Sequence, residues 1–170
     1  MTHFADVATI HQIAEVLDVD VNLLMSDAAD SATAITVEDN RFLMRRYLTV
    51  LEQALPNARC YGFERASEAL KFAHSNKVDI AFLDIEMPVI NGIQLAKSLK
   101  RINPQINIIF VTAYNDYAPD AYRLHASGYL SKPVDAAKVK EEVENLRYPV
   151  AFSGGEKLKI KCFGNFEIFF

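Results

Sequence analysis

The stretch VDIAFLDIEMPVINGI (residues 78–93) decides the fold of this chain. A short apolar run ends at Asp84, and a Met-Pro turn and an Asn-Gly pair follow it. An apolar run of this length, bounded by turn residues, is typical of a strand that is buried on both faces. A carboxylate at the end of such a strand is costly unless other groups share its charge. The partners of Asp84 should therefore lie at the ends of neighbouring strands.

The alternation of strand and helix extends on both sides of this stretch. Short apolar runs predict strands over residues 34–37, 59–63, 78–83, 106–111 and 128–130. Apolar positions at helical spacing predict helices over residues 40–54, 64–74 and 92–101, from near Pro119, and around 136–146. Five strands that alternate with five helices favour an α/β fold with a parallel, doubly wound sheet, in which ligands bind at the carboxyl edge.

Two polar or Gly-rich segments divide the chain into parts. Residues 28–33 and 148–157, the second with Pro149 and the pair Gly154-Gly155, are predicted linkers. They separate a short helical N-terminal extension (1–27), a central domain (34–147) and a C-terminal strand (158–170), which alternates apolar and polar residues.

The composition fits a soluble intracellular protein. Of the 170 residues, 51% are apolar and 24% charged, and the net charge of −4 gives no electrostatic reason for the whole chain to bind nucleic acid. Cys60 and Cys162 lie too far apart for a metal-ligand motif and suit a reducing compartment. No signal peptide and no apolar run of about 18–20 residues is visible, which predicts a cytoplasmic location without a membrane anchor.

Polar side chains recur at the carboxyl ends of the predicted strands. The first strand ends in Glu38-Asp39, the third in Asp84 and the fourth in Thr112, and the fifth leads into Lys132-Pro133. Three adjacent carboxylates repel one another, and a hard divalent cation such as Mg²⁺ would offset that charge. Aspartate can attack phosphorus to give an acyl phosphate, while an ammonium and a hydroxyl neutralise the phosphoryl oxygens. The pattern predicts a pocket for Mg²⁺ and a phosphoryl group.

Four motifs in order carry a family resemblance. With VEDN (37–40), LDIEMPVINGI (83–93), FVTAYNDYAPDAY (110–122) and GYLSKPV (128–134), residues 34–147 resemble the receiver domain of a bacterial two-component response regulator. The resemblance implies a five-stranded flavodoxin-like sheet. The implied roles are phospho-acceptor for Asp84, Mg²⁺ ligation by Glu38, Asp39, Asp84 and the backbone carbonyl of Glu86, phosphate binding by Lys132, and switching by Thr112 and Tyr129. Glu38 stands where the family more often has aspartate.

The resemblance also implies a function. A sensor histidine kinase or phosphotransfer protein would phosphorylate Asp84, and Thr112 and Tyr129 would then repack the face formed by the fourth helix, fifth strand and fifth helix. That face would control homodimerisation and a transcriptional output, with DNA contacts only through output regions missing from this chain. Glu86 and Tyr114, each two residues beyond a site residue, are predicted to flank the path of the water that hydrolyses the acyl phosphate.

The two ends carry weaker resemblances. Residues 8–27 resemble the last two helices of a phage-repressor-type helix-turn-helix domain, and the alternative is an amphipathic extension that packs on the receiver or on a partner. CFGNFEIFF (162–170) resembles the first strand of a winged-helix transcriptional activator output, so a truncated output domain is expected. The motifs LDIEMP and FVTAYNDYA also resemble receivers attached to LytTR-type outputs, although the C-terminal strand argues against that class.

Two other functions compete with this interpretation. A haloacid-dehalogenase-type phosphatase also uses a strand-end aspartate, but its motif needs a second aspartate where this chain has Glu86, and Thr or Val where it has Pro88. The chain is therefore predicted not to be an enzyme. A receiver-like interaction or dimerisation module that never needs phosphate remains the alternative.

Overall fold

Strands and helices alternate along the computed structural model, which describes residues 31–113 and 117–152. The strands are β1 (Thr33–Val37), β2 (Arg59–Phe63), β3 (Ile80–Asp84), β4 (Asn107–Thr112) and β5 (Gly128–Ser131). The helices are α3 (Arg41–Ala54), α4 (Ala66–Ser75), α5 (Gly92–Ile102), α6 (Ala118–Arg123) and α7 (Ala136–Glu144). This confirms the predicted five parallel strands and five helices. The predicted N-terminal helices and C-terminal strand lie outside the described residues.

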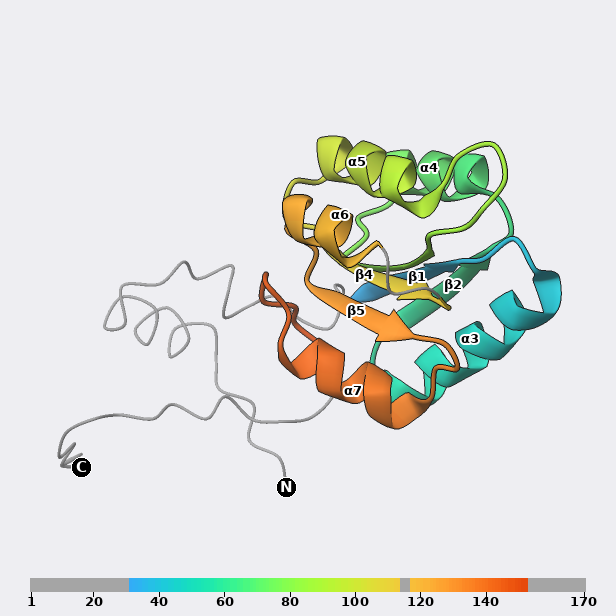
Figure 1. Ribbon diagram of the computed structural model, residues 1–170. Helices are drawn as coiled ribbons and strands as arrows, with labels where there is room; N and C mark the ends of the chain where they lie inside the picture. The colour runs from blue at the N-terminus through green and yellow to red at the C-terminus, as the bar shows by residue number, and fades with distance from the viewer. Residues whose placement is uncertain (1–30, 114–116, 153–170) are drawn as a thin grey trace, which may run out of the picture.

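The five strands form one parallel sheet in the order β2-β1-β3-β4-β5. Helices α4, α5 and α6 cover one face, and α3 and α7 cover the other (Figure 1). The strand order reverses between β1 and β3, because the chain moves outward from β1 to β2 and then returns to the other side of β1. In sheets of this type the reversal opens a crevice at the carboxyl ends of the two strands.

The core has two halves, one on each face of the sheet. Every residue of β1, β3 and β4 is buried, as expected of central parallel strands. Side chains on one face, such as Leu83 and Phe110, pack under α4 and α5, and those on the other, such as Phe82 and Ile109, pack under α3 and α7. The buried strands hold the loops at their carboxyl ends in fixed positions.

Three helices begin with side-chain caps close to the carboxyl edge. Asn40 caps α3 by accepting from the backbone N–H groups of Phe42 and Leu43, and Asn91 forms a capping box with Gln94 at the start of α5. Asp135 caps α7 by accepting from the N–H of Lys138. Residue 40, predicted as helical, is thus the cap itself, and α4 starts at Ala66 rather than at residue 64.

Part of the predicted second linker packs against the domain. The side chain of Asn107 donates to the carbonyl of Tyr148 at 3.0 Å and accepts from its backbone N–H at 3.0 Å. Val150 and Phe152 contact the core half under α3 and α7. At the other end, β1 begins at Thr33, inside the predicted first linker. Cys60 is a free thiol, and no described helix has the length and apolar character to cross a bilayer.

Gly92 lets the start of α5 approach the end of β3. A Cβ atom at this position would overlap the backbone carbonyl of Asp84 and lie 2.9 Å from the Cα of Ile85. We expect Gly92→Ala to lower the free energy of unfolding by about 1–3 kcal/mol, because backbone atoms cannot yield as a side chain can. Urea unfolding measures this. The control is Gly128→Ala, where the new methyl meets the flexible end of the Glu142 side chain. An equal loss in both variants would contradict the prediction.

Candidate functional site

Three carboxylates meet where the strand order reverses. Glu38 and Asp39 directly follow β1, and Asp84 is the last residue of the neighbouring strand β3. One oxygen of each lies within 4.8 Å of an oxygen of the others. Glu38 and Asp84 are 2% and 6% exposed, whereas Asp39 is exposed at the rim. The predicted acidic residues are therefore brought together at one edge.

Lys132 joins the two buried carboxylates. Its Nζ lies 2.6 Å from Oε2 of Glu38 and 3.2 Å from Oδ2 of Asp84. The residue follows β5, its backbone N–H donates to the carbonyl of Thr112 at 2.9 Å, and a cis bond joins it to Pro133. The ammonium also lies 5.7 Å from the centre of the Tyr47 ring, within cation–π range. Lys132 thus shares its charge between the β1 and β3 carboxylates.

Burial and charge shift the protonation equilibria in opposite directions. Burial raises the pKa of Glu38 and of Asp84 above their ordinary values, although the bonds from Lys132 act against this rise. For Lys132, burial lowers the pKa, but the hydrogen bond to Glu38 and the charge of Asp84 outweigh burial, so its pKa is raised. The site holds a firmly protonated ammonium beside two carboxyl groups that favour a further cation.

Thr112 and Tyr129 lie on the strands that complete the edge. Thr112 is the last residue of β4, is 1% exposed, and follows Val111, the strand partner of Asp84. Tyr129 pairs with Phe110 in the β4–β5 ladder and is half-buried against the core half under α4 and α5. Thr112 thus lies next to the end of β3 on the neighbouring strand, and Tyr129 lies one strand further out, level with Leu83.

Glu86 connects the loop after β3 to the start of α6. Its backbone N–H donates to Oδ1 of Asp84 at 3.4 Å, and its side chain accepts from the hydroxyl of Tyr117 at 3.3 Å. Tyr117 caps the N-terminus of α6, because its carbonyl accepts from the N–H groups of Asp120 and Ala121. Tyr114, the other predicted tuning residue, lies outside the described residues.

The donor set fits a Mg²⁺ ion. Oxygens on opposite sides of an octahedral Mg²⁺ are about 4.2 Å apart, since each Mg–O distance is about 2.1 Å. The separations of up to 4.8 Å among Glu38, Asp39 and Asp84 need only small side-chain adjustments to meet that limit, and waters can complete the shell. Lys132 already holds one oxygen of Glu38. Lys132 also holds one oxygen of Asp84 at 3.2 Å, so the exposed Asp39 is the most available ligand of the three.

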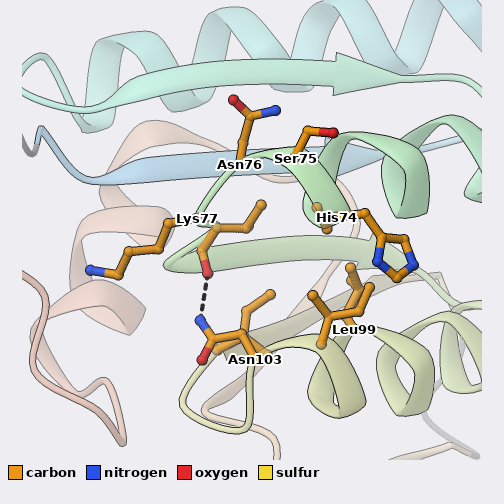
Figure 2. Close-up of a pocket in the computed structure, with 10 residues that line it drawn as sticks. His74, Ser75, Asn76, Lys77, Leu99 and Asn103 are labelled. Atoms are coloured by element: carbon orange, nitrogen blue, oxygen red, sulfur yellow. Dashed lines mark hydrogen bonds between the residues drawn. The ribbon is translucent and has the colours of Figure 1, made fainter.

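A pocket that does not include these residues lies elsewhere on the domain. It has a volume of about 430 Å³ and opens between the ends of α4 and α5, at the amino edge of the sheet. Figure 2 shows His74, Ser75, Asn76 and Lys77 on one side of it and Leu99 and Asn103 on the other. The Asn103 amide donates to the carbonyl of Val78. Its lining contains none of the carboxylates or the lysine described above, so pocket size does not locate the candidate site.

Sequence reasoning missed three contacts of the site. The sequence motifs assign no role in the site to Tyr47 or Tyr117, and they do not indicate the direct ion pair between Glu38 and Lys132. The sole sequence signal for Tyr47 is its place eight residues beyond Asp39 on the buried side of α3. The other two contacts join residues 31 and 94 positions apart, and no local pattern indicates them.

Comparisons with known proteins agree with this geometry. The family description "Response regulator receiver domain" matches residues 34–144. An uncharacterized response regulatory protein of Vibrio cholerae is 34% identical over 116 residues, which are 67% of this chain and 48% of that protein. The sensory transduction protein LytT of Oceanobacillus iheyensis is 30% identical over 125 residues, 72% of this chain and 51% of that protein. The chain thus spans about half the length of the curated relatives it matches.

Solved structures give the same result. The response regulatory domain of MrkE from Klebsiella pneumoniae is 31% identical, with a TM-score of 0.57, and the match covers 67% of this chain and 93% of that one. TrrA from Thermotoga maritima, solved in complex with Mg²⁺ and BeF, is 28% identical with a TM-score of 0.59, covering 66% of this chain and 96% of that one. With the acidic cluster at the switch point of a five-stranded parallel sheet, these matches show that the chain belongs to the response regulator receiver domain family.

Proposed function

We propose that Asp84 accepts a phosphoryl group from the phosphohistidine of a sensor histidine kinase or phosphotransfer protein in the cytoplasm, and that this modification controls dimerisation and a transcriptional output. One observation carries the proposal. The Lys132 ammonium bonds to both Glu38 and Asp84 while Asp39 completes the acidic cluster, so a nucleophilic carboxylate, a phosphate-binding cation and a metal-binding set share one edge.

The proposed step is an in-line transfer between two atoms. A carboxylate oxygen of Asp84 attacks phosphorus, the P–N bond to the donor imidazole breaks, and the imidazole leaves with the bonding electron pair. Lys132 stabilises the negative charge on the phosphoryl oxygens, and Thr112 can donate a hydrogen bond to them. Glu38, Asp39 and Asp84 would hold a Mg²⁺ ion, which would supply further positive charge against the phosphoryl oxygens. The relative solved with Mg²⁺ and BeF supports this use of the site.

The direct test is labelling of the full chain by a small phosphodonor. With acetyl phosphate and Mg²⁺, intact mass spectrometry should show one phosphoryl group per chain, and hydroxylamine should remove it, as expected of an acyl phosphate. EDTA should prevent the labelling, because Asp39 and Asp84 bring too much negative charge to the transfer without a metal. Failure to label under any Mg²⁺ concentration would contradict the proposed function.

Asp39 is expected to be needed for the metal. At pH 7, Mg²⁺ at about a hundred times its dissociation constant should raise the free energy of unfolding of the wild-type chain by about 2.7 kcal/mol. Asp39→Asn should lose most of this gain, since it removes an exposed charged ligand of the cluster. Thermal unfolding with Mg²⁺ and with EDTA measures the difference. Glu64→Gln, an exposed acid that pairs with Arg41, should keep the full Mg²⁺ response.

The output face is proposed to be α6, β5 and α7. Phosphorylation would draw Thr112 toward the phosphoryl group and let Tyr129 move inward, which changes the surface next to Tyr122, a residue that is 83% exposed. Relatives named as transcriptional regulators, such as YpdB of Escherichia coli, support a transcriptional output. The output is proposed to be of the winged-helix or the LytTR type. The proposed boundaries of the chain are an N-terminal extension over 1–27, a receiver domain over 34–147 and the first strand of the output over 158–170, joined by linkers. A dimer whose measured mass is the same with and without Mg²⁺ and the phosphoryl mimic beryllofluoride would instead favour a receiver-like dimerisation module that does not need phosphorylation.

A further inference from the structure

We propose that the acidic N-terminal segment, residues 1–30, docks on the exposed face of α3 within the same chain. This face consists of Phe42, Arg45, Arg46 and Thr49, which follow one another at helical spacing and are all exposed.

Phe42 is an unusual residue for a solvated surface. It is 84% exposed, and it is one of four large hydrophobic side chains that are exposed among the described residues, with Tyr61, Val89 and Tyr122. A solvent-exposed phenylalanine ring has no polar group to hydrate, so covering it gains free energy. Its place one turn from two arginines makes the face both apolar and cationic.

The arginines of this face leave positive charge available. Among the described residues, Arg45 and Arg46 take part in no ion pair that the structure shows, and Arg41 pairs with Glu64 at 3.5 Å in an exposed position. A second cationic group, Lys97, Lys100 and Arg101 on α5, has no large exposed hydrophobic side chain beside it. The α3 face is therefore the better match for an acidic amphipathic segment.

The N-terminal segment has the complementary chemistry. Residues 1–30 contain six acids and no lysine or arginine, so they carry −6, and residues 31–170 carry +2 because the whole chain carries −4. Ile10, Ile13 and Leu17 form one apolar side of a predicted helix whose other sides bear Glu15 and Asp18. With its apolar side on Phe42, such a helix places Asp18 at the flank of the contact, near the arginines, and Glu15 on the far side adds to the negative charge of the segment.

Because the N-terminal segment is joined to the domain, even a weak contact is enough to keep it on the α3 face for much of the time. From Leu17 to Ser31 the chain can span up to about 46–50 Å. Strand β1 leads from Ser31 to the edge of the sheet where α3 begins, and it is about 17 Å long, so the segment can reach the α3 face. Because both partners belong to one chain, their effective concentration is about 1 mM, so a dissociation constant of about 1 mM would fill the face about half of the time. The C-terminal segment is a poorer candidate. It follows Phe152, which lies beside the carboxyl-terminal ends of α3 and α7, whereas Phe42 lies at the start of α3.

A single tryptophan reports on this docking. The chain contains no tryptophan, so Phe42→Trp gives one fluorescent probe in the full chain while keeping an aromatic ring. Acrylamide is the quencher, because it is neutral and its local concentration does not follow the protein charge. Neutralising three acids by Glu15→Gln, Asp18→Asn and Asp20→Asn should raise the quenching constant about twofold, as expected for a face that is half covered. Arg45→Glu with Arg46→Glu should do the same.

Matched controls separate docking from general charge effects. The triple variant Glu68→Gln, Glu141→Gln and Glu144→Gln removes the same number of acids from the surface of the domain, and Lys138→Glu with Lys140→Glu reverses two charges on α7; neither should change the quenching. Circular dichroism checks that every variant folds. Equal quenching in all variants would overturn the proposal, as would an equal rise in the controls. Protection of the introduced indole that grows with protein concentration would assign the face to a second copy and would also overturn intramolecular docking.

Discussion

Asp84→Asn is expected to abolish phosphorylation without unfolding the domain. The amide of asparagine is not a nucleophile toward phosphorus, so acetyl phosphate with Mg²⁺ should add no phosphoryl group to the variant under conditions that label the wild-type chain fully. Intact mass spectrometry measures the labelled fraction. The control is Asp120→Asn on α6, which alters a half-exposed aspartate that pairs with Arg123 and should label like the wild type.

Asp84→Asn should also keep the stability of the domain, because it removes a buried charge from the site. Burial raises the pKa of Asp84, so the ionised side chain makes a folded domain at neutral pH less stable than a neutral side chain would. In Asp84→Asn, Lys132 keeps its 2.6 Å bond to Glu38, and one buried charge is gone. Unfolding midpoints equal to or above the wild-type value at pH 7 are expected. Stoichiometric labelling of this variant would contradict the assignment of Asp84, and a large loss of stability would contradict the electrostatic argument.

The sheet was predictable because its strands are buried on both faces. A run such as residues 106–111 is almost wholly apolar because both of its sides are covered, and Asp84 and Thr112 mark where the strands β3 and β4 end. Once the strands are parallel, topology alone places the residues that follow them at one edge. This is why Glu38, Asp39 and Asp84 could be predicted as neighbours although 45 positions separate Asp39 from Asp84.

The contacts inside the site were less predictable because they depend on side-chain conformations. Whether Lys132 reaches Glu38, Asp84 or solvent is decided by the loop after β5 and by the packing of Tyr47, neither of which has a local sequence signal. The same holds for residues 148–152, for which Pro149 and the nearby Gly154-Gly155 pair predicted a linker. The side chain of Asn107, the first residue of β4, makes one hydrogen bond to the carbonyl and one to the N–H of Tyr148, and these two bonds hold the segment on the domain.

Lys132→Met is expected to cause the largest loss of stability at this site. The Lys132 side chain is 17% exposed and those of Glu38 and Asp84 are 3% and 7% exposed, so the variant would leave two buried carboxylates without their shared cation. Breaking a buried ion pair from one side costs about 3–5 kcal/mol. In EDTA at pH 7, urea unfolding should show a loss of this order. Lys140→Met, an exposed lysine on α7, is the matched control and should change stability little.

The pH dependence of that loss follows from the direction of the carboxyl pKa shifts. Burial already raises the pKa of Glu38 and Asp84, and without Lys132 both values must rise further. When the pKa of a carboxyl group is higher in the folded state than in the unfolded state, the domain keeps its stability below the unfolded-state pKa, near pH 4. It loses that stability as the pH rises through the folded-state pKa. The gap between Lys132→Met and the wild type should therefore be small near pH 4 and wide at pH 7, and Mg²⁺ should narrow it at pH 7 by replacing the missing positive charge. A gap that does not vary with pH would show that Lys132 stabilises the domain by packing rather than by charge.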